Sequence, residues 1–274
     1  MLDDLADAIR RHGRPGGART AVPRMVLVHQ EEALEAVDLT YTSMLCLVVS
    51  GAKRQWIGDQ YDVIASGQVF LSLVDTPVLA AMDDRYLSVT IELDLVQLSE
   101  ALPPEAPTRD ELAFQTEADA QLIEAMTRWV GLLDGPASLR HDLAPLMERE
   151  ILVRLSHGPL RSALRAALDG EGLVELRAAL TFIDQQLEQD MTVDQIAAAA
   201  HISVSTLGRI FRAWMKQSPM QYRQIQRLRR ARALLLSGSR GVADVASAVG
   251  YSSASQFSRE YRQRYGVPPS RAGG

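Results

Sequence analysis

The sequence has 274 residues and only one cysteine, which excludes a disulfide framework and any zinc or iron–sulfur site built from several cysteines. It has no apolar run of about 18 residues, the length that a membrane-spanning helix needs. The amino-terminal segment MLDDLADAIRRHGRPGG is charged and lacks the apolar core of a signal peptide. Low-complexity tracts are also absent. We therefore expect a soluble, intracellular, globular protein with no membrane partner.

Acidic and basic residues are divided unevenly along the chain. The formal net charge of -5 by itself argues against a nucleic-acid partner. However, residues 175–274 hold 14 Lys and Arg against 7 Asp and Glu, whereas residues 1–174 hold 15 against 27. A basic half masked by an acidic half indicates nucleic-acid binding by the basic half. The alternative is an arginine-rich helical surface that only faces solvent.

Residues 175–270 are predicted to be helical. Apolar residues recur at helical spacing between positions 176 and 187. Thr192 and Gln195 can form a capping box in front of a short alanine-rich helix, and Ser203 can cap a second helix after a tight turn. A short helix, a tight turn and a capped second helix are the parts of a helix-turn-helix unit.

The same pattern returns about fifty residues later, with one extra residue in the second turn, around Ser252 and Ser253. Because the turn, the cap, the apolar positions and an arginine all match, we interpret the region as two copies of one unit. The matching pairs are Val193 and Val242, Ile196 and Val245, Ala197 and Ala246, Ser203 and Ser252, Leu207 and Phe257, Arg209 and Arg259, and Phe211 and Tyr261.

A longer helix is predicted between the two units. Ser218 can cap it, Pro219 suits its first position, and its apolar stripe ends near Leu236, with five arginines spread around the rest of its surface. At 1.5 Å per residue, 18 residues span about 27 Å. Such a helix can hold two recognition helices roughly one turn of DNA apart, about 34 Å.

Residues 175–270 resemble the DNA-binding domain of the AraC/XylS family of bacterial transcription regulators. The resemblance covers over a third of the chain, and its one departure is Gln217, where many members have glycine. The residues that carry it include Ser203, Ser205, Leu207, Arg209, Phe211, Ser218, Pro219, Tyr222, Arg227, Leu228, residues 249–253 and 255–259, Tyr265, Gly266, Pro268 and Pro269.

The resemblance implies that the third and sixth helices of this domain read DNA bases. An arginine can grip guanine with two hydrogen bonds, and serine can reach a base or a phosphate. Each arginine could instead be a solvated surface charge. The predicted base-reading residues are Ser205, Gly208, Arg209, Ala254, Ser255, Ser258 and Arg259. The predicted phosphate contacts are Ser203, Arg212, Lys216, Ser252 and Arg262.

Gly208 lies inside a predicted helix, where glycine costs about 1 kcal/mol relative to alanine. Two interpretations stay open. The absent side chain lets the backbone approach the groove, or it allows close packing against a neighbouring helix.

Residues 22–93 show short apolar runs separated by turn signals, which is the pattern of a β-barrel or jelly roll. The segment 49–54, followed by Gly58, Tyr61, Gly67 and residues 73–77, resembles the cupin-like sensor domain of one AraC-family branch. A helix is expected to start within residues 93–98. The predicted strands are residues 25–29, 44–49, 53–57, 61–64, 69–73, 78–82 and 86–93.

A metal-dependent cupin enzyme would need three or four His or carboxylate ligands on facing strands. Only His29 lies in the predicted β region. We therefore expect no enzymatic activity, no catalytic residues, no metal and no cofactor, with a cupin enzyme fused to a DNA-binding module as the alternative. Cys46 is expected to be a buried apolar residue, with redox or electrophile sensing as the alternative.

A barrel of this size can hold a small ligand. Arg54 would suit a carboxylate or a phosphate. In the alternative interpretation, Lys53 and Arg54 lie at the surface and the aromatic residues belong to the core. The candidate pocket residues are His29, Arg54, Trp56, Tyr61 and Tyr86.

Residues 117–135 and 139–157 predict two amphipathic helices. In the family such helices often pair two subunits, and the alternative is that they only cover the barrel. The predicted domains are a cupin-like ligand-sensing domain (1–112), a helical linker and dimerisation segment (113–170) and a double helix-turn-helix domain (171–274).

The predicted fold is therefore α+β in two domains, a cupin-like β-barrel followed by helices and then an all-α DNA-binding domain. The expected function is sequence-specific, effector-responsive transcription regulation in the bacterial cytoplasm, at the nucleoid when bound, with activation as the commoner mode in the family. Expected partners are promoter DNA, a second copy of the chain, RNA polymerase as a further candidate, and a small acid, aldehyde, sugar or nucleotide second messenger. A ligand-independent DNA-binding dimer is the alternative.

Overall fold

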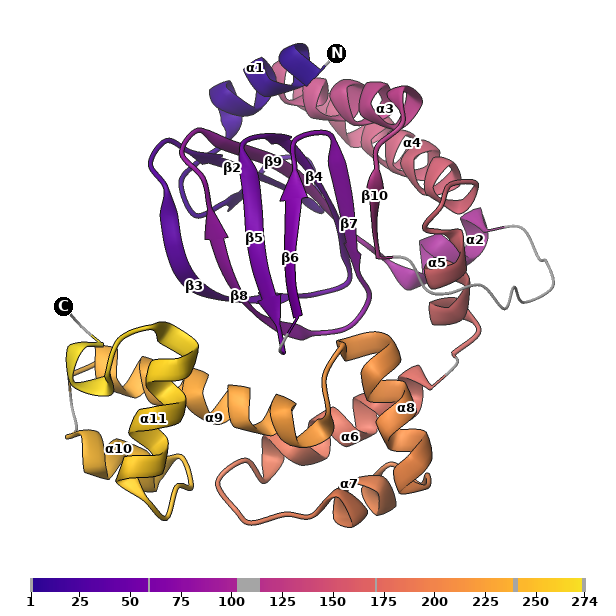
Figure 1. The fold of residues 1–274 in the computed structure, drawn as a ribbon. Coiled ribbons are helices and arrows are strands. Elements are labelled where there is room, and N and C mark those ends of the chain that lie inside the picture. Colours follow the sequence, from indigo (N-terminus) through magenta and orange to yellow (C-terminus); the bar gives the residue numbers. More distant parts are fainter. Residues whose placement is uncertain (1, 59, 103–113, 171, 239–240, 273–274) are drawn as a thin grey trace. The chain divides into compact units, whose positions relative to one another are not determined.

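The structure, a computed structural model, describes residues 2–58, 60–102, 114–170, 172–238 and 241–272 (Figure 1). The chain divides into two compact units, one within residues 1–56 and 61–171 and the other within residues 57–60 and 172–274. The predicted domain boundary after residue 112 lies outside the described residues and the one after residue 170 borders on them, so both stay predictions.

No helix in the described part of the chain is both long enough and apolar enough to cross a membrane.

The amino-terminal unit is built on two antiparallel sheets, which confirms the predicted β-rich fold (Figure 1). The strands form two separate sheets and not a closed barrel. Sheet A has the order β1-β2-β9-β4-β7-β10, and sheet B the order β3-β8-β5-β6. The strands are β1 Ala18–Arg19, β2 Met25–Gln30, β3 Leu34–Tyr41, β4 Met44–Ser50, β5 Ala52–Ile57, β6 Gln60–Ala65, β7 Gln68–Ser72, β8 Thr76–Met82, β9 Tyr86–Glu92 and β10 Gln115–Glu117.

Seven of these strands agree with the prediction to within one or two residues, and three were missed. β3 was missed because Glu35 and Asp38 interrupt its apolar residues, and its pairing with β8 is irregular between Leu34 and Val37. β1 and β10 are too short to give a periodic signal. A strand pattern alone could not have found them.

The two faces of sheet A differ in chemistry. Cys46 pairs in register with Phe70 on one side and Thr90 on the other, so these three side chains share one face. The opposite face carries buried apolar side chains such as Leu47 and Val89. Helix α1 (Leu2–His12) packs on β2, β4 and β9, with Leu5 and Ile9 fully buried.

The two predicted helical segments after the sheets are confirmed, and the amphipathic pattern is clear in the first of them. They are α3 (Ala120–Gly131) and α4 (Ala137–Ser156), joined by the 3₁₀ turn η1 (Leu132–Asp134). Helix α3 packs on α1 and α4, and α4 also packs on α2 (Leu95–Ala101) and α5 (Arg161–Leu168). Helix α2 begins after its cap Asp94, within the segment where a helix was expected.

The carboxy-terminal unit is entirely helical within its described residues, as predicted. Helix α9 contacts both α8 and α10, and Figure 1 shows it running between the two short helix pairs. The helices are α6 Leu173–Gln185, α7 Val193–Ala199, α8 Val204–Met215, α9 Pro219–Leu236, α10 Val242–Ala248, α11 Ala254–Tyr265 and the 3₁₀ turn η2 Pro269–Arg271.

Candidate nucleic-acid interface

The first helix-turn-helix consists of α7 and α8, and its local caps are the predicted ones. The Oγ1 atom of Thr192 accepts from the Gln195 amide at 3.3 Å, and the Gln195 side chain accepts from the Thr192 amide at 2.8 Å. The Oγ atom of Ser203 accepts from the Thr206 amide at 3.1 Å and so fixes the start of α8. Such a start aims free amide groups outward, which suits an anion.

Helix α8 packs against the rest of its unit through one apolar stripe, and the predicted DNA-contact residues lie on its exposed face. Leu207, Ile210 and Phe211 are buried. Ser205 and Arg209 lie on the opposite stripe, one helical turn apart, and both are exposed. Ser203 and Arg212 extend this exposed surface along the helix.

The second helix-turn-helix consists of α10 and α11 and repeats this arrangement with one correction. The cap of α11 is Ser253, whose Oγ accepts from the Gln256 amide at 3.3 Å, and not Ser252. Ser252 is an exposed turn residue. The extra residue of the second turn thus precedes the cap, because Ser203 and Ser253 are equivalent at a spacing of 50.

Helix α11 also buries one stripe and exposes the other. Phe257, Tyr261 and Tyr265 are buried and pack on one another with tilted rings, whose centroids are 5.6 and 4.6 Å apart. The predicted contacts Ala254, Ser255, Arg259 and Arg262 are exposed, and Ser258 is half-buried, with its hydroxyl donating to the Ala254 carbonyl at 2.8 Å.

The exposed arginines of α8 and α11 are not neutralised by acidic side chains of the described residues. None of Arg209, Arg212, Arg259 and Arg262 forms an ion pair with a residue that the structure describes, whereas Arg230 on α9 pairs with Glu188 at 2.8 Å. The one carboxylate on these two helices, Glu260, accepts from the Tyr251 hydroxyl at 2.6 Å and from the side-chain Nε2 of Gln256 at 2.9 Å.

Lys216 differs from the other predicted phosphate contacts. It ends α8 in the left-handed conformation, at φ 53°, and is half-buried. The helix therefore ends at Met215, two residues before Gln217, the position where many members of the family have glycine. The backbone turns at Lys216 without a glycine, at the modest strain that a non-glycine residue bears there.

Packing does not require a glycine at position 208. A Cβ atom built there would meet only the Arg212 guanidinium, at 3.6 Å, which is an ordinary contact. The interpretation that Gly208 packs closely against a neighbouring helix is therefore wrong. The glycine lies on the half-buried edge of the same surface as Arg209 and Arg212.

Two arginines of α9 are structural, although the sequence placed all five on the helix surface. Arg223 and Arg227 are buried. Arg227 donates to the carbonyls of Leu187, Glu188 and Gln189 at 2.7, 3.1 and 3.2 Å, and Arg223 also donates to Gln189. Both therefore tie α9 to the loop between α6 and α7.

Arg227 also contacts the second helix-turn-helix. The Arg227 guanidinium lies 5.8 Å from the ring centre of Tyr251, in the turn of the second motif. Gly250 adopts φ +85°, and a Cβ atom there would lie 2.3 Å from the Glu188 carbonyl. Only glycine fits at position 250. The contacts of Gly250 with the Glu188 carbonyl and of Arg227 with Tyr251 therefore link the two motifs through α9.

The five candidate pocket residues of the amino-terminal unit do not gather at one site. On β5, Lys53 and Gln55 are buried, so Arg54 and Trp56 point to the other face of sheet B by strand alternation. Arg54 pairs with Asp83 at 3.1 Å, and Trp56 stacks on the half-exposed Tyr61 at 5.1 Å.

The other two candidates lie on sheet A. His29 pairs in register with Leu87, next to Tyr86 in sequence, so the two side chains point to opposite faces. His29 contacts the Glu31 carboxylate at 2.6 Å, and Tyr86 is buried. Within the described residues, no cluster of three His, Cys, Asp or Glu suits a metal ion.

Sequence reasoning missed the residues that do gather between the sheets. Lys53 is only 5% exposed, so the alternative interpretation that placed it at the surface is wrong. Its ammonium lies 4.6 Å from the ring centre of Tyr41 and 5.2 Å from that of Phe70. Cys46 is buried, as expected. The missed signal was the alternation of Lys53 and Gln55 on a strand of a two-sheet fold.

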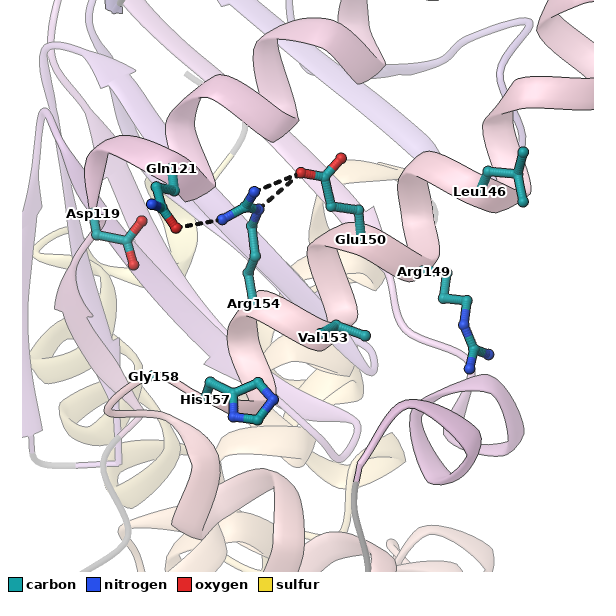
Figure 2. A pocket seen from close by; sticks show the side chains of 9 residues that line it. All are labelled: Asp119, Gln121, Leu146, Arg149, Glu150, Val153, Arg154, His157 and Gly158. Atoms are coloured by element: carbon teal, nitrogen blue, oxygen red, sulfur yellow. Dashed lines mark hydrogen bonds and ion pairs between the residues drawn. The ribbon is translucent and has the colours of Figure 1, made fainter.

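A surface pocket lies along α3 and α4 (Figure 2). Arg154 crosses it, pairing with Glu150 at 2.8 Å and donating to the Gln121 side chain at 2.6 Å. Leu146 stands at its edge and is 64% exposed. The lining residues are Asp119, Gln121, Leu146, Arg149, Glu150, Val153, Arg154, His157 and Gly158.

Comparison with known proteins finds two matching family segments. An AraC-type transcriptional regulator N-terminus matches residues 21–163, and a helix-turn-helix domain matches residues 196–272. The first segment alone is more than half of the chain.

Curated relatives with these segments are regulators. The HTH-type transcriptional regulator ArgR of Pseudomonas aeruginosa is 31% identical over 135 residues, 47% of this chain and 40% of that protein. A probable thc operon regulatory protein of Rhodococcus erythropolis is 30% identical over 213 residues, 71% of this chain and 60% of that protein. The transcriptional activator NphR of a Rhodococcus species is 35% identical over 118 residues, 36% of this chain and 33% of that protein. The chain covers less than two thirds of each relative's length.

Proposed function

Because the chain belongs to the AraC family of transcriptional regulators, we propose that it binds promoter DNA sequence-specifically and changes transcription in response to a small effector. The carboxy-terminal unit is the DNA reader, and the amino-terminal unit is the sensor. Its place of action is the bacterial cytoplasm, on the chromosome.

One observation carries the reader assignment. Two capped helices, equivalent at a spacing of 50 residues, each expose two arginines that form no ion pair within the described chain. Arg209 and Arg259 occupy the central positions, where they can grip guanine edges in the major groove. Arg212, Arg262 and the half-buried Lys216 lie toward the helix ends, where they suit phosphates, as do Ser203 and Ser252 near the helix starts.

An electrophoretic shift titration of the full chain on its own upstream DNA tests this assignment. Arg209→Ala and Arg259→Ala should each weaken binding about 5–150-fold, the equivalent of about 1–3 kcal/mol, and relax the sequence preference. Arg230→Ala is the matched control, because this exposed arginine already pairs with Glu188. Unchanged affinity in both recognition-helix variants would contradict the assignment.

We also propose that a second copy of the chain packs on α4. Leu139 and Leu146 lie seven residues apart on this helix and are 47% and 64% exposed, and Leu146 lines the pocket of Figure 2. An apolar face of this kind is suited to burial in an interface. Leu146→Arg should shift the molecular mass measured by light scattering from dimer to monomer, and a variant that stays dimeric would contradict the proposal.

Activation through RNA polymerase is the proposed mode of regulation, and it is supported by the relative that is named as an activator. Effector binding in the amino-terminal unit would change operator affinity by a coupling free energy of about 1–3 kcal/mol.

A further inference from the structure

We propose that the effector is a small organic monocarboxylate and that it binds between the two sheets, with its carboxylate on Lys53 and its apolar body against Tyr41 and Phe70. This inference rests on the proposed sensing role of the amino-terminal unit. It replaces the scattered pocket candidates with one cluster, which consists of Tyr41, Cys46, Lys53, Phe70 and Tyr86 and is called the Lys53 cluster below.

The Lys53 cluster joins the inner faces of both sheets. Tyr41 on β3 and Lys53 on β5 belong to sheet B, and Cys46, Phe70 and Tyr86 belong to sheet A. The Tyr41 and Phe70 rings are 5.2 Å apart across the gap between the sheets. The Lys53 ammonium faces both rings, so its charge lies between the sheets.

This charge has no counter-ion among the residues that the structure describes. The ammonium contacts the two aromatic rings and interacts with the Cys46 side chain, but it forms no ion pair and no hydrogen bond with a described residue. A buried ammonium without an anion is unfavourable, and natural proteins bury charges almost only in pairs. Burial lowers the pKa of Lys53 to about 8, so the side chain is still mainly protonated at neutral pH. An arriving anion would complete the pair.

The surroundings of Lys53 are more polar than a purely structural interior requires. Ser88 and Thr90 lie on the same side of β9 as Tyr86, and all three are buried. The buried Tyr86 hydroxyl interacts with the side chains of Ser88 and Cys46. The Tyr41 hydroxyl donates to the Gln55 side chain at 2.8 Å. Two apolar sheets would pack together without these groups, whereas a polar ligand uses them for orientation.

The chemistry of the cluster selects a monocarboxylate. Lys53 is its one cation, so it can neutralise one negative charge, whereas a phosphate dianion would leave charge buried. A neutral sugar would leave the ammonium unpaired. The Tyr86 hydroxyl can donate to the second carboxylate oxygen, and the rings of Tyr41 and Phe70 suit an apolar or aromatic body.

The sequence makes a direct measurement of this site simple, because it has only two lysines, Lys53 and Lys216. In the full chain labelled with ¹⁵N-lysine, NMR would show two ammonium signals, and Lys216→Arg identifies the one from Lys53. Benzoate and hexanoate are the probes, and benzamide and hexanamide are their uncharged controls.

At least one of the two carboxylates should move the Lys53 signal in a saturable way and raise the midpoint of its titration above pH 8, while its amide does not. Lys53→Met should abolish the thermal stabilisation by that carboxylate. A Lys53 signal that neither carboxylate moves, or that the amides move equally, overturns the proposal. Retardation of DNA by the same protein then shows whether the reader assignment still stands.

Discussion

At the scale of single residues, outward-facing positions were predictable and inward-facing polar ones were not. The positions of Arg209 and Arg259 followed from a helical repeat in which the apolar partners leave only one face free. On β5 the usual rule fails, because Lys53 and Gln55 point inward while Trp56 points outward. A hydropathy pattern assigns such a strand the reverse orientation, and only the second sheet reveals the correct one.

Gly208 gives a prediction that separates stability from DNA binding. Gly208→Ala should raise the free energy of unfolding by up to about 1 kcal/mol, because alanine favours a helix and the new Cβ has room. The same substitution should weaken operator binding if the backbone approaches DNA there. Chemical denaturation and an electrophoretic shift assay measure the two effects. A loss of stability would contradict the open environment of Gly208.

Lys53→Met should stabilise the effector-free chain at pH 7 by up to about 3 kcal/mol, because the pKa of Lys53 is lowered by burial from 10.5 to about 8 and methionine carries no charge. Urea denaturation measures the difference between the two proteins. A variant that is less stable than the parent would show that Lys53 has a structural role.

The pH dependence of this difference has a definite sign. Below pH 8, Lys53 is protonated in both the folded and the unfolded state. Between pH 8 and about 9.5 the unfolded state binds the extra proton, so Lys53 adds stability as the pH rises, by about 1–2 kcal/mol. The advantage of Lys53→Met should shrink accordingly. Comparing the two proteins cancels most of the contributions of the other titratable groups of the cluster, Tyr41, Cys46 and Tyr86. An advantage that stays constant with pH would contradict the buried, unpaired charge.

At the scale of elements, helix starts were predictable because capping is local in sequence. Thr192, Ser203 and Ser218 cap the predicted helices in the predicted way. The cap of α11 was displaced by one residue, because two adjacent serines both satisfy the local rule and only the length of the preceding turn decides between them. Arg223 and Arg227 could not be placed from the sequence, because their carbonyl partners lie about 35–40 residues away.

The two serines provide a matched pair of substitutions. Ser253→Ala should lower the free energy of unfolding by about 1 kcal/mol, because it removes the side-chain acceptor for the Gln256 amide. Ser252→Ala, at an exposed turn position, should change stability by less than about 0.5 kcal/mol. Thermal denaturation followed by circular dichroism distinguishes them. Equal effects would contradict the placement of the cap.

At the scale of the whole molecule, the charge and the fold divide at the same place. The all-helical unit has an excess of basic over acidic residues, and the acidic excess of the β-rich unit disfavours non-specific DNA contacts outside the two proposed recognition helices. The order of β and helical segments was sufficient to predict this two-part architecture. The polar interior between the two sheets was not predictable, because it depends on which strand faces which across the gap.

The central claim is that one chain reads two successive major-groove segments through α8 and α11. Hydroxyl-radical and methylation-interference footprinting of the full chain on its upstream DNA tests it most directly. We expect two protected segments about 10 base pairs apart for each subunit, with Arg209→Ala erasing one and Arg259→Ala erasing the other. A single protected segment, or the loss of the same segment in both variants, would contradict the claim.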